Sequence, residues 1–383
     1  MKRTYLDNGA TSFPKAPGVA ESINNYILNV GTNIGRGAYS EAFQTESLVF
    51  ETREMIAELF GAEDSKNVVF TKNVTESLNV LLHGYLKSGD HVIVSSMEHN
   101  AMMRPLVAME SMGVTFTRIQ PDINGFFDEK DLQDALKPET KLVAMMHASN
   151  VFGTILDLES VGKFAKTNGL KFIVDAAQTA GFMPVKMELL NADAIAFTGH
   201  KSLLGPQGIG GFVISDAFAV EVKTLIQGGT GSRSDSEQQP DYLPDKFESG
   251  TPNTLGIIGL NASLKYILEQ GMQNIREHEL MLTSELIKAL DSNENVKIIG
   301  QHGTIYRTPV ISIDTPDHDS AMVSHALAST YGVNNRCGMH CAPAAHKTMG
   351  TFPQGTIRFS FGFSNTLEDV KIVADALKEI FEM

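Results

Sequence analysis

Lys201 is the residue of this sequence best placed to do covalent chemistry. It follows His200 in a turn between an apolar run that ends at Thr198 and the glycine-containing stretch 205–208. A lysine that is partly removed from water is a nucleophile that can form a Schiff base with an aldehyde. An isolated lysine in such a turn is more often a solvated surface residue. The interpretation therefore depends on the residues that the fold brings to Lys201.

An acidic residue directly follows the apolar run 172–174. Asp175 would carry its charge at the end of a buried strand, which costs free energy unless a cation or a donor faces it. A ring nitrogen of the pyridinium type is such a partner, and an acid that keeps it protonated makes the ring an electron sink. Capping of the following helix is the simpler alternative role for Asp175.

Polar residues also follow three other apolar runs. Thr75 and Glu76 lie at a strand-to-helix junction, where backbone N–H groups and a hydroxyl suit a phosphate. His99 could stack on a planar ring, and Asn150 could donate a hydrogen bond to a ring hydroxyl. A plain helix N-cap at Thr75 and a polar loop histidine at His99 are the alternatives. Each of these features is weak when taken alone.

Short apolar runs alternate with helical patterns over roughly residues 67–248, which predicts an α/β domain with a large, mainly parallel sheet. Uninterrupted apolar runs are typical of parallel strands buried on both faces. The carboxyl ends of such strands meet at one edge of the sheet, where open α/β sheets bind ligands. The polar residues above are therefore expected to lie together. The predicted strands are 68–70, 91–94, 142–146, 172–174, 193–197 and 211–214, and the predicted helices are 75–86 and about 102–109.

The later part of the chain has a different pattern, which predicts a smaller α+β domain. The whole chain has 383 residues, which exceeds the size at which one hydrophobic core usually stops growing, so two domains are expected. We expect an N-terminal segment (1–30) at the cleft with the small domain, a large domain (31–260) and a small domain (261–383). The predicted elements are helices 254–269 and 272–290, strands 296–299, 310–313, 333–336 and 357–361, and helices beginning near 319 and 366.

Composition narrows the classes of function. The net charge is −14 and no basic run stands out, which disfavours binding to nucleic acids and anionic membranes. Only two cysteines are present, so a disulfide framework is not expected, and neither is a metal site. No apolar run is long enough to span a bilayer, and the N-terminus does not resemble a signal peptide. A cytoplasmic location is therefore expected.

Taken together, these segments resemble a known family almost from end to end. The sequence is similar to the class V (fold type I) enzymes that depend on pyridoxal 5′-phosphate (PLP), in the branch of cysteine desulfurases and selenocysteine lyases. The joint presence of the His-Lys and Asp-Ala-Ala-Gln segments is the most specific part of this resemblance. The matching segments are 5–11, 33–37, the stretch around Asn150, 175–178, 198–201, 250–253, and Arg358 with 365–366.

The resemblance implies a role for each residue around the cofactor ring. Lys201 is implied to carry PLP as a Schiff base, and Asp175 to pair with the pyridine nitrogen. Gln178 and Asn150 are implied to approach the phenolic oxygen of the cofactor, and His99 to stack on its ring. Asn150 is also expected at the substrate, and His99 is counted with the catalytic residues.

Phosphate and substrate contacts follow from the same resemblance. Thr75, Thr198 and His200 are implied to hold the phosphate, and Thr251 to reach the phosphate of a neighbouring subunit, which makes a homodimer functional. Arg358 matches the position that binds the substrate α-carboxylate, a task that suits a bidentate guanidinium. The alternatives for this carboxylate site are Arg36 and Arg336.

The segment 336–342 reads Arg-x-Gly-x-His-Cys-Ala and resembles the motif that carries the catalytic cysteine in one branch of the family. The matching residue is Cys341, and Cys337 is not expected to accept sulfur. A thiolate is required for attack on sulfur, and His340 could help to maintain it. A buried structural role for Cys341 and a Cys337–Cys341 redox pair are the alternatives.

The expected activity is conversion of L-cysteine to L-alanine, with the sulfur moved to Cys341 as a persulfide and then to an acceptor protein. Selenocysteine or another cysteine derivative is an alternative substrate, since the tract 228–234 and Pro343 depart from the best-known desulfurases. A class V aminotransferase, which would not need Cys341, is a second alternative. A non-catalytic scaffold for sulfur or iron–sulfur assembly is a third, and the intact set of Lys201, Asp175 and Arg358 argues against it.

Overall fold

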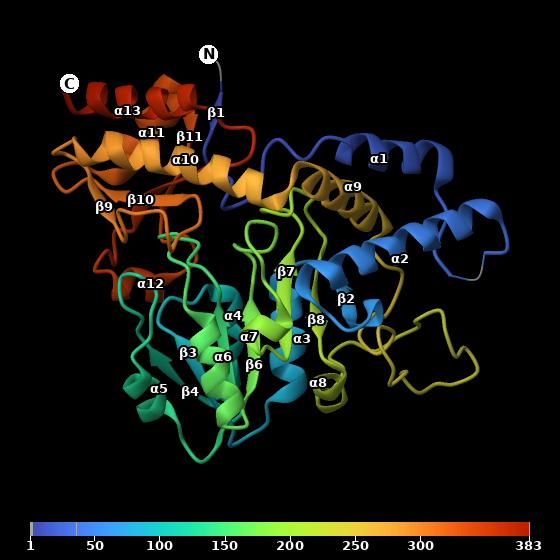
Figure 1. The fold of residues 1–383 in the computed structure, drawn as a ribbon. Coiled ribbons are helices and arrows are strands. Elements are labelled where there is room, and N and C mark those ends of the chain that lie inside the picture. The colour runs from blue at the N-terminus through green and yellow to red at the C-terminus, as the bar shows by residue number, and fades with distance from the viewer. Residues whose placement is uncertain (1–2, 36, 383) are drawn as a thin grey trace.

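Seven strands form the sheet at the centre of the larger part of the molecule (Figure 1). The computed structural model describes residues 3–35 and 37–382. The strand order is β2-β8-β7-β6-β5-β3-β4; the last five run parallel, and β8 is antiparallel to both neighbours. The predicted α/β class with a mainly parallel sheet is confirmed. The strands are β2 (Val68–Thr71), β3 (His91–Ser95), β4 (Thr115–Ile119), β5 (Thr140–Met146), β6 (Lys171–Asp175), β7 (Ala194–Thr198) and β8 (Gly210–Ile214).

Helices cover both faces of this sheet, which explains why its inner strands are apolar without alternation. One core lies under α3, α4 and α8, where Leu81, Met102 and Phe218 are buried. The other lies under α2, α6 and α9, where Phe60 and Leu260 are buried. The helices are α2 (Ser40–Phe60), α3 (Val74–Tyr85), α4 (Asn100–Glu110), α5 (Glu129–Ala135), α6 (Leu158–Thr167), α7 (Met187–Leu190), α8 (Asp216–Glu221) and α9 (Thr254–Gln270).

A second, antiparallel sheet of order β12-β13-β10-β9 belongs to the C-terminal part of the chain. Helices α10, α11 and α13 pack on it and form a third core, to which Leu286, Leu327 and Phe359 contribute. The elements are α10 (Met272–Asp291), β9 (Lys297–Ile299), β10 (Val310–Asp314), α11 (Ser320–Tyr331), β11 (Val333–Asn334), β12 (Arg336–Gly338), α12 (Pro343–Thr348), β13 (Thr356–Ser360) and α13 (Leu367–Glu382).

The N-terminal segment connects the two parts. Strand β1 (Thr4–Tyr5) pairs in parallel with β11, and Leu6 is buried in the third core. Farther along, α1 (Val19–Asn25) packs against α9, and the π-helical turn η1 (Tyr26–Val30) directly follows α1. We keep the division at residues 30 and 260 as a prediction; α9 crosses the second position and packs in the core of the large sheet.

Two elements that the sequence pattern did not predict have evident physical reasons. Helix α2 carries exposed Phe43 and Phe50 and buried Thr45 and Thr52, so its apolar periodicity is blurred. Strand β4 is an edge strand whose side chains are mostly exposed or half-buried. The single strand predicted at 333–336 is two short strands. They are interrupted at Asn335, whose side chain bonds Ser324 at 2.6 Å and the Val333 carbonyl at 3.1 Å.

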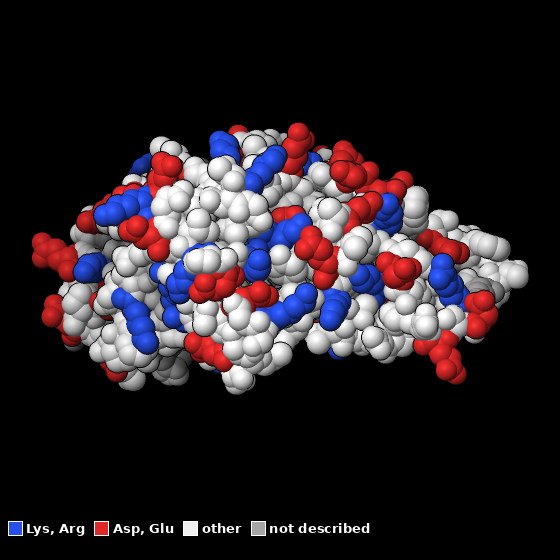
Figure 2. Space-filling model, turned by 90° about the horizontal axis from the view of Figure 1, so that it is seen from below, with Lys and Arg blue, Asp and Glu red and all other residues white. Residues whose placement is uncertain are grey.

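The surface charge is mixed on the face shown in Figure 2, where basic and acidic side chains are interspersed. Among residues 3–35 and 37–382, no helix combines the length and the apolar composition that crossing a bilayer requires.

Candidate active site

The turn that carries Lys201 is fixed by backbone contacts on both sides. Gly199 donates to the Ile209 carbonyl at 2.9 Å, and Leu204, in the left-handed region at φ +58°, donates to the Lys201 carbonyl at 2.8 Å. From the N-terminal segment, the backbone N–H of Ser12 donates to the His200 carbonyl at 2.8 Å. The lysine therefore projects from a turn that the sheet and the N-terminal segment hold together.

Charged groups from distant parts of the chain lie close enough to Lys201 to affect its pKa. The pKa of Lys201 is lowered to about 8, mainly by burial and also by the positive charges of Arg358 and Arg336. Asp175 and Cys341 act in the opposite direction. A lysine with this pKa holds a substantial fraction of free amine near neutral pH, which is the form that attacks a carbonyl.

Asp175 ends strand β6 in a buried position, as the sequence predicts. Burial raises the pKa of its carboxyl group, while a hydrogen bond from the Ala177 N–H at 2.9 Å and the charge of Lys201 oppose this rise. The bond to Ala177 shows that Asp175 caps the turn after its strand. This local role and a role toward a bound cation are compatible, since a carboxylate has two oxygens.

His99 is the N-cap of α4 and lies within electrostatic reach of Lys201. Its Nδ1 accepts a hydrogen bond from the Ala101 N–H at 3.0 Å. The pKa of His99 is lowered to about 4, mainly by burial and also by the charge of Lys201. The ring is therefore neutral near pH 7, which suits stacking on a planar group.

Arg358 is a buried arginine of β13 that is held by two partners. Its guanidinium donates to the Asn150 carbonyl at 2.9 Å and to Asp7 at 2.6 Å. Arg336 lies opposite Arg358 in the β12–β13 pair and also binds Asp7, at 2.9 Å. Like charges directly opposite in a sheet repel each other, so Asp7 offsets this repulsion. Arg36, the other alternative for binding a carboxylate, lies outside the described residues.

Cys341 lies in a turn whose backbone is strained. His340 and Cys341 have φ angles of +48° and +58°, which side-chain-bearing residues rarely adopt. The Asn150 side chain donates to the His340 carbonyl at 2.8 Å, and the Asn100 N–H donates to the Cys341 carbonyl at 2.8 Å. These bonds hold the turn in a shape that leaves Cys341 exposed.

His340 does not supply a positive charge to this turn. Burial lowers its pKa to about 3, and the charge of Arg358 acts in the same direction. The imidazole is therefore neutral near pH 7. A role of His340 toward the Cys341 thiolate stays a prediction, and it would be that of a proton acceptor rather than of a positive charge.

Cys337 belongs to a different environment from Cys341. It stands in β12 next to Arg336, so its side chain points to the opposite face of the sheet, where it packs against the third core. Burial raises the pKa of the Cys337 thiol. A raised pKa and a packed position disfavour reactivity, which supports the choice of Cys341 as the nucleophile.

Several buried polar atoms near Lys201 have no hydrogen-bond partner among the described residues. Buried polar groups are normally paired, so a cluster of unpaired atoms fits a polar ligand that binds there. The unpaired atoms are Asn150 Oδ1, Thr198 Oγ1, His200 Nδ1 and Arg358 Nε.

Gln178 is joined to the N-terminal segment rather than left free. Its side-chain amide donates to the Gly9 carbonyl at 3.0 Å, and the Gly9 N–H donates to Ser360 Oγ at 2.7 Å. Gln178, Gly9 and Lys201 line the same small cavity. The amide therefore lies at the same cavity as the lysine, and its approach to the phenolic oxygen of a cofactor stays a prediction.

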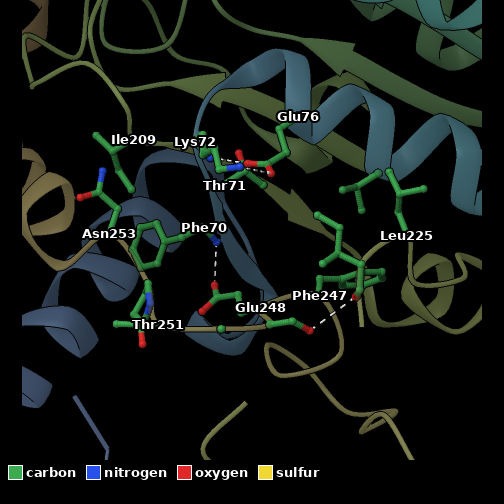
Figure 3. Close-up of a pocket in the computed structure, with 15 residues that line it drawn as sticks. Phe70, Thr71, Lys72, Glu76, Ile209, Leu225, Phe247, Glu248, Thr251 and Asn253 are labelled. Atoms are coloured by element: carbon green, nitrogen blue, oxygen red, sulfur yellow. Dashed lines mark hydrogen bonds and ion pairs between the residues drawn. The ribbon is translucent and has the colours of Figure 1, made fainter. Parts of the chain in front are cut away.

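Glu76 and Thr251 line a second pocket (Figure 3), and Thr75 directly precedes Glu76 in α3. The N-cap of α3 is Asn73, and the exposed Thr75 hydroxyl makes no hydrogen bond to the described residues. Glu76 accepts from the Lys72 N–H at 2.6 Å, so its carboxylate is already used locally. Glu76 and Thr251 line this pocket together, and Lys201 and Asp175 do not.

Two buried acids next to the site were not predicted from the sequence. Both Glu98 oxygens accept from the Met146 N–H at 3.0 Å, and burial raises the Glu98 pKa to about 8. Glu279 lines the cavity of Lys201, and burial raises its pKa to about 8 as well. The position of Glu98 between a buried strand and His99 could have identified it as a site residue from the sequence. Glu279 could not be identified in this way, because it resembles any other acidic residue of an amphipathic helix.

The fold and this site define the class of protein. The family model for class-V aminotransferases matches residues 4–373, and the chain belongs to this family. The mainly parallel sheet with a lysine and an acid at its carboxyl edge agrees with that membership.

The following similar proteins share one name, cysteine desulfurase. The chain is 34% identical to a probable cysteine desulfurase of Methanothermobacter thermautotrophicus, over 99% of this chain and 95% of the relative. It is 35% identical to another from Pyrococcus abyssi, over 98% and 94% of the two chains. The structure of a cysteine desulfurase from Thermococcus onnurineus matches with a TM-score of 0.92 and 33% identity, covering 99% and 95%. CsdA, a cysteine desulfurase from Escherichia coli, matches with a TM-score of 0.89, 28% identity and the same coverage.

Proposed function

We propose that this protein is a PLP-dependent cysteine desulfurase that converts L-cysteine to L-alanine and takes the sulfur onto Cys341 as a persulfide. The observation that carries the proposal is the convergence of four groups from distant parts of the chain. Asp175, Arg358 and Cys341 are all close enough to Lys201, the fourth group, to shift its pKa electrostatically. The named relatives and structural neighbours support the same activity.

The residues around Lys201 fit PLP. Lys201 would hold it covalently, Asp175 would face the ring nitrogen, and His99 would face the ring. Asn150 and Gln178 would reach the phenolic oxygen, and Thr198, His200 and Thr75 would hold the phosphate. The unpaired atoms of Asn150, Thr198 and His200 support this arrangement. When bound, PLP supplies an electron sink that stabilises negative charge at the substrate α-carbon.

Arg358 would bind the carboxylate of L-cysteine, with Asp7 and the Asn150 carbonyl fixing the orientation of the guanidinium. Lys201 would take the proton from the α-carbon. A pKa of about 8 suits a group that must accept and then return a proton near neutral pH.

The sulfur step belongs to Cys341. Its thiolate would attack the sulfur of the substrate, forming an S–S bond while the C–S bond of the substrate breaks. The electron pair of the C–S bond goes to the carbon that becomes the alanine methyl group, which takes up the equivalent of the proton released when Cys341 ionised. Lys201 would return its proton to the α-carbon. The products are alanine and a persulfide on Cys341, and no external oxidant or reductant is consumed.

A homodimer is part of the proposal. Thr251 lines a surface groove together with Phe50, whose side chain is 54% exposed. Ile27 and Leu28, also exposed, lie in η1, which directly follows α1. Helices α1 and α2 lie at the same end of the molecule (Figure 1). Exposed apolar side chains of this kind are typical of subunit interfaces. In such a dimer Thr251 would contribute to the site of the neighbouring subunit.

The decisive experiment measures alanine and sulfide together after incubation with L-cysteine, PLP and dithiothreitol. The two products should form in equal amounts. Without reductant, mass spectrometry should find the persulfide on the peptide that contains Cys341. Cys341→Ser should abolish this persulfide, and Cys337→Ser should retain most activity. Full turnover by Cys341→Ser, or a persulfide on Cys337, would refute the mechanism and favour an aminotransferase or another β-lyase.

A further inference from the structure

A surface groove lies between helix α4, the edge strand β4 and helix α12. These three elements are far apart in the sequence but share the left side of the molecule in Figure 1. The floor and walls combine apolar side chains with three cations. The lining includes Met103, Val107, Pro343 and Ala344 together with Arg104, Arg118 and Lys347.

The three cations of this groove are exposed and form no ion pair with any residue in the described ranges. Arg118 lies over the Phe116 ring at 4.7 Å, and Lys347 lies over the Phe352 ring at 5.0 Å. The net charge of the protein is −14, so a group of unpaired cations is a local exception. Such a group attracts an acidic partner and repels a basic one.

The groove is continuous with the turn of Cys341. Pro343, which lines the groove, is two residues from Cys341, so their Cα atoms are at most about 8 Å apart. On the other side, Asn100 lines the groove and its N–H holds the Cys341 carbonyl at 2.8 Å. A molecule seated in the groove would therefore lie next to the exposed Cys341 thiol.

The groove is also distant from the expected dimer interface. The exposed apolar side chains belong to helix α2 and to the turn η1 that directly follows α1. Helices α1 and α2 lie at the right of Figure 1, away from the groove. Formation of the proposed dimer would leave the groove open. A second partner could bind there while the active site remains complete.

We propose that this groove docks an acidic protein whose thiol accepts the sulfur from Cys341. The proposal rests on the function proposed above. The acceptor thiolate attacks the outer sulfur of the Cys341 persulfide, the S–S bond breaks, and Cys341 leaves as a thiolate. The acceptor becomes the persulfide, so the exchange needs no oxidant. Apolar contacts to Met103 and Val107 and ion pairs to Arg118 and Lys347 hold the partner.

Two synthetic peptides serve as probes, each with one cysteine flanked by leucines. One carries Asp and Glu around this core, and the other carries Lys in their place. The Cys341 persulfide is formed with L-cysteine, excess cysteine is removed, and transfer to each peptide is followed by mass spectrometry. We expect the acidic peptide to accept sulfur about 10-fold faster at low salt, and the difference to shrink in 0.5 M salt, because screening weakens the attraction.

The double variant Arg118→Glu/Lys347→Glu should remove this preference. Arg104 is left unchanged because its charge also acts on His99. The matched control is Lys163→Glu/Lys371→Glu, which alters the net charge by the same amount at exposed lysines of α6 and α13 and should keep the preference. Alanine formation with dithiothreitol should be unchanged in both variants.

Equal transfer to the two peptides would overturn the groove as a docking site. Equal loss of preference in the groove variant and the control variant would do the same, because the effect would then reflect net charge alone. Absence of alanine from the unmodified protein would instead refute the proposed desulfurase activity, so the two failures are distinguishable.

Discussion

The side chain of Asn150 donates a hydrogen bond to the carbonyl of His340, 190 positions away in the chain, at 2.8 Å. The backbone carbonyl of the same asparagine accepts from Arg358 at 2.9 Å. One residue therefore joins the turn of the proposed nucleophile to the arginine proposed to bind the substrate. Because His340 and Cys341 are both in the left-handed region, their turn needs such external contacts to keep its shape.

Asn150→Ala should loosen the Cys341 turn even in the cofactor-free protein. Loss of one buried hydrogen bond is worth about 1 kcal/mol, which corresponds to roughly fivefold faster local opening. Hydrogen exchange should therefore accelerate for the amides of Asn100 and Ala342, which bond within and beside the turn. Gln178→Ala is the matched control, because it removes an equally buried amide that binds the Gly9 carbonyl. Unchanged exchange at Asn100 in Asn150→Ala would contradict the positioning role.

The amine of Lys201 should titrate near pH 8 in the cofactor-free protein, because burial lowers its pKa to about 8. Only the neutral amine reacts with acetic anhydride, so labelling of Lys201 should rise as the pH passes through 8. In the urea-unfolded protein the midpoint should return toward the ordinary lysine value of about 10.5. Asp175→Asn should move the folded midpoint to lower pH, because it removes a negative charge that stabilises the ammonium form. A midpoint that stays the same on unfolding would exclude the desolvated environment.

Borohydride reduction of the protein loaded with PLP should fix the cofactor on the peptide that contains Lys201. Lys15 is a demanding control, because burial lowers its pKa to about 8 as well and its ammonium group contacts the His200 carbonyl at 3.1 Å. Lys201→Ala should lose the fixed cofactor, and Lys15→Met should retain it. Cofactor on Lys15 in the unmodified protein would show that a low pKa alone, rather than the geometry around Asp175, selects the lysine.

Arg358→Lys should weaken the binding of L-cysteine by about 1–3 kcal/mol, because the charge is kept while the planar, multiply bonded guanidinium is lost. The apparent KM for L-cysteine in the alanine assay measures this effect. Arg336→Lys is the control, since Arg336 shares Asp7 but is half exposed. It should change KM much less. The reverse order of the two effects would move the carboxylate site to Arg336.

The proximity of Lys201 and Asp175 was predictable, because Asp175 directly follows one apolar run and Lys201 lies in the turn that follows another. In a parallel sheet such positions meet at one edge, and β6 and β7 are indeed neighbours. His99 and Asn150 follow the same logic on the strands beside them. The roles of Arg358 and the Cys341 turn were accessible only through the family resemblance, and the contacts of Asp7 were not predicted. Their contacts link residues more than 150 positions apart, and no local pattern encodes such contacts.

The sequence by itself therefore determined the class of fold, the family, and the lysine and acid at the sheet edge. Period and residue type report local structure, and a parallel sheet converts strand ends into neighbours. Only the tertiary structure decided which groups are charged and which are held in place. It showed that His340 is neutral, that Asn150 fixes the Cys341 turn, and that a cationic groove begins beside this turn. Burial keeps His340 neutral. Long-range packing creates the Asn150 contact and the groove, because both depend on contacts that the chain makes only when folded.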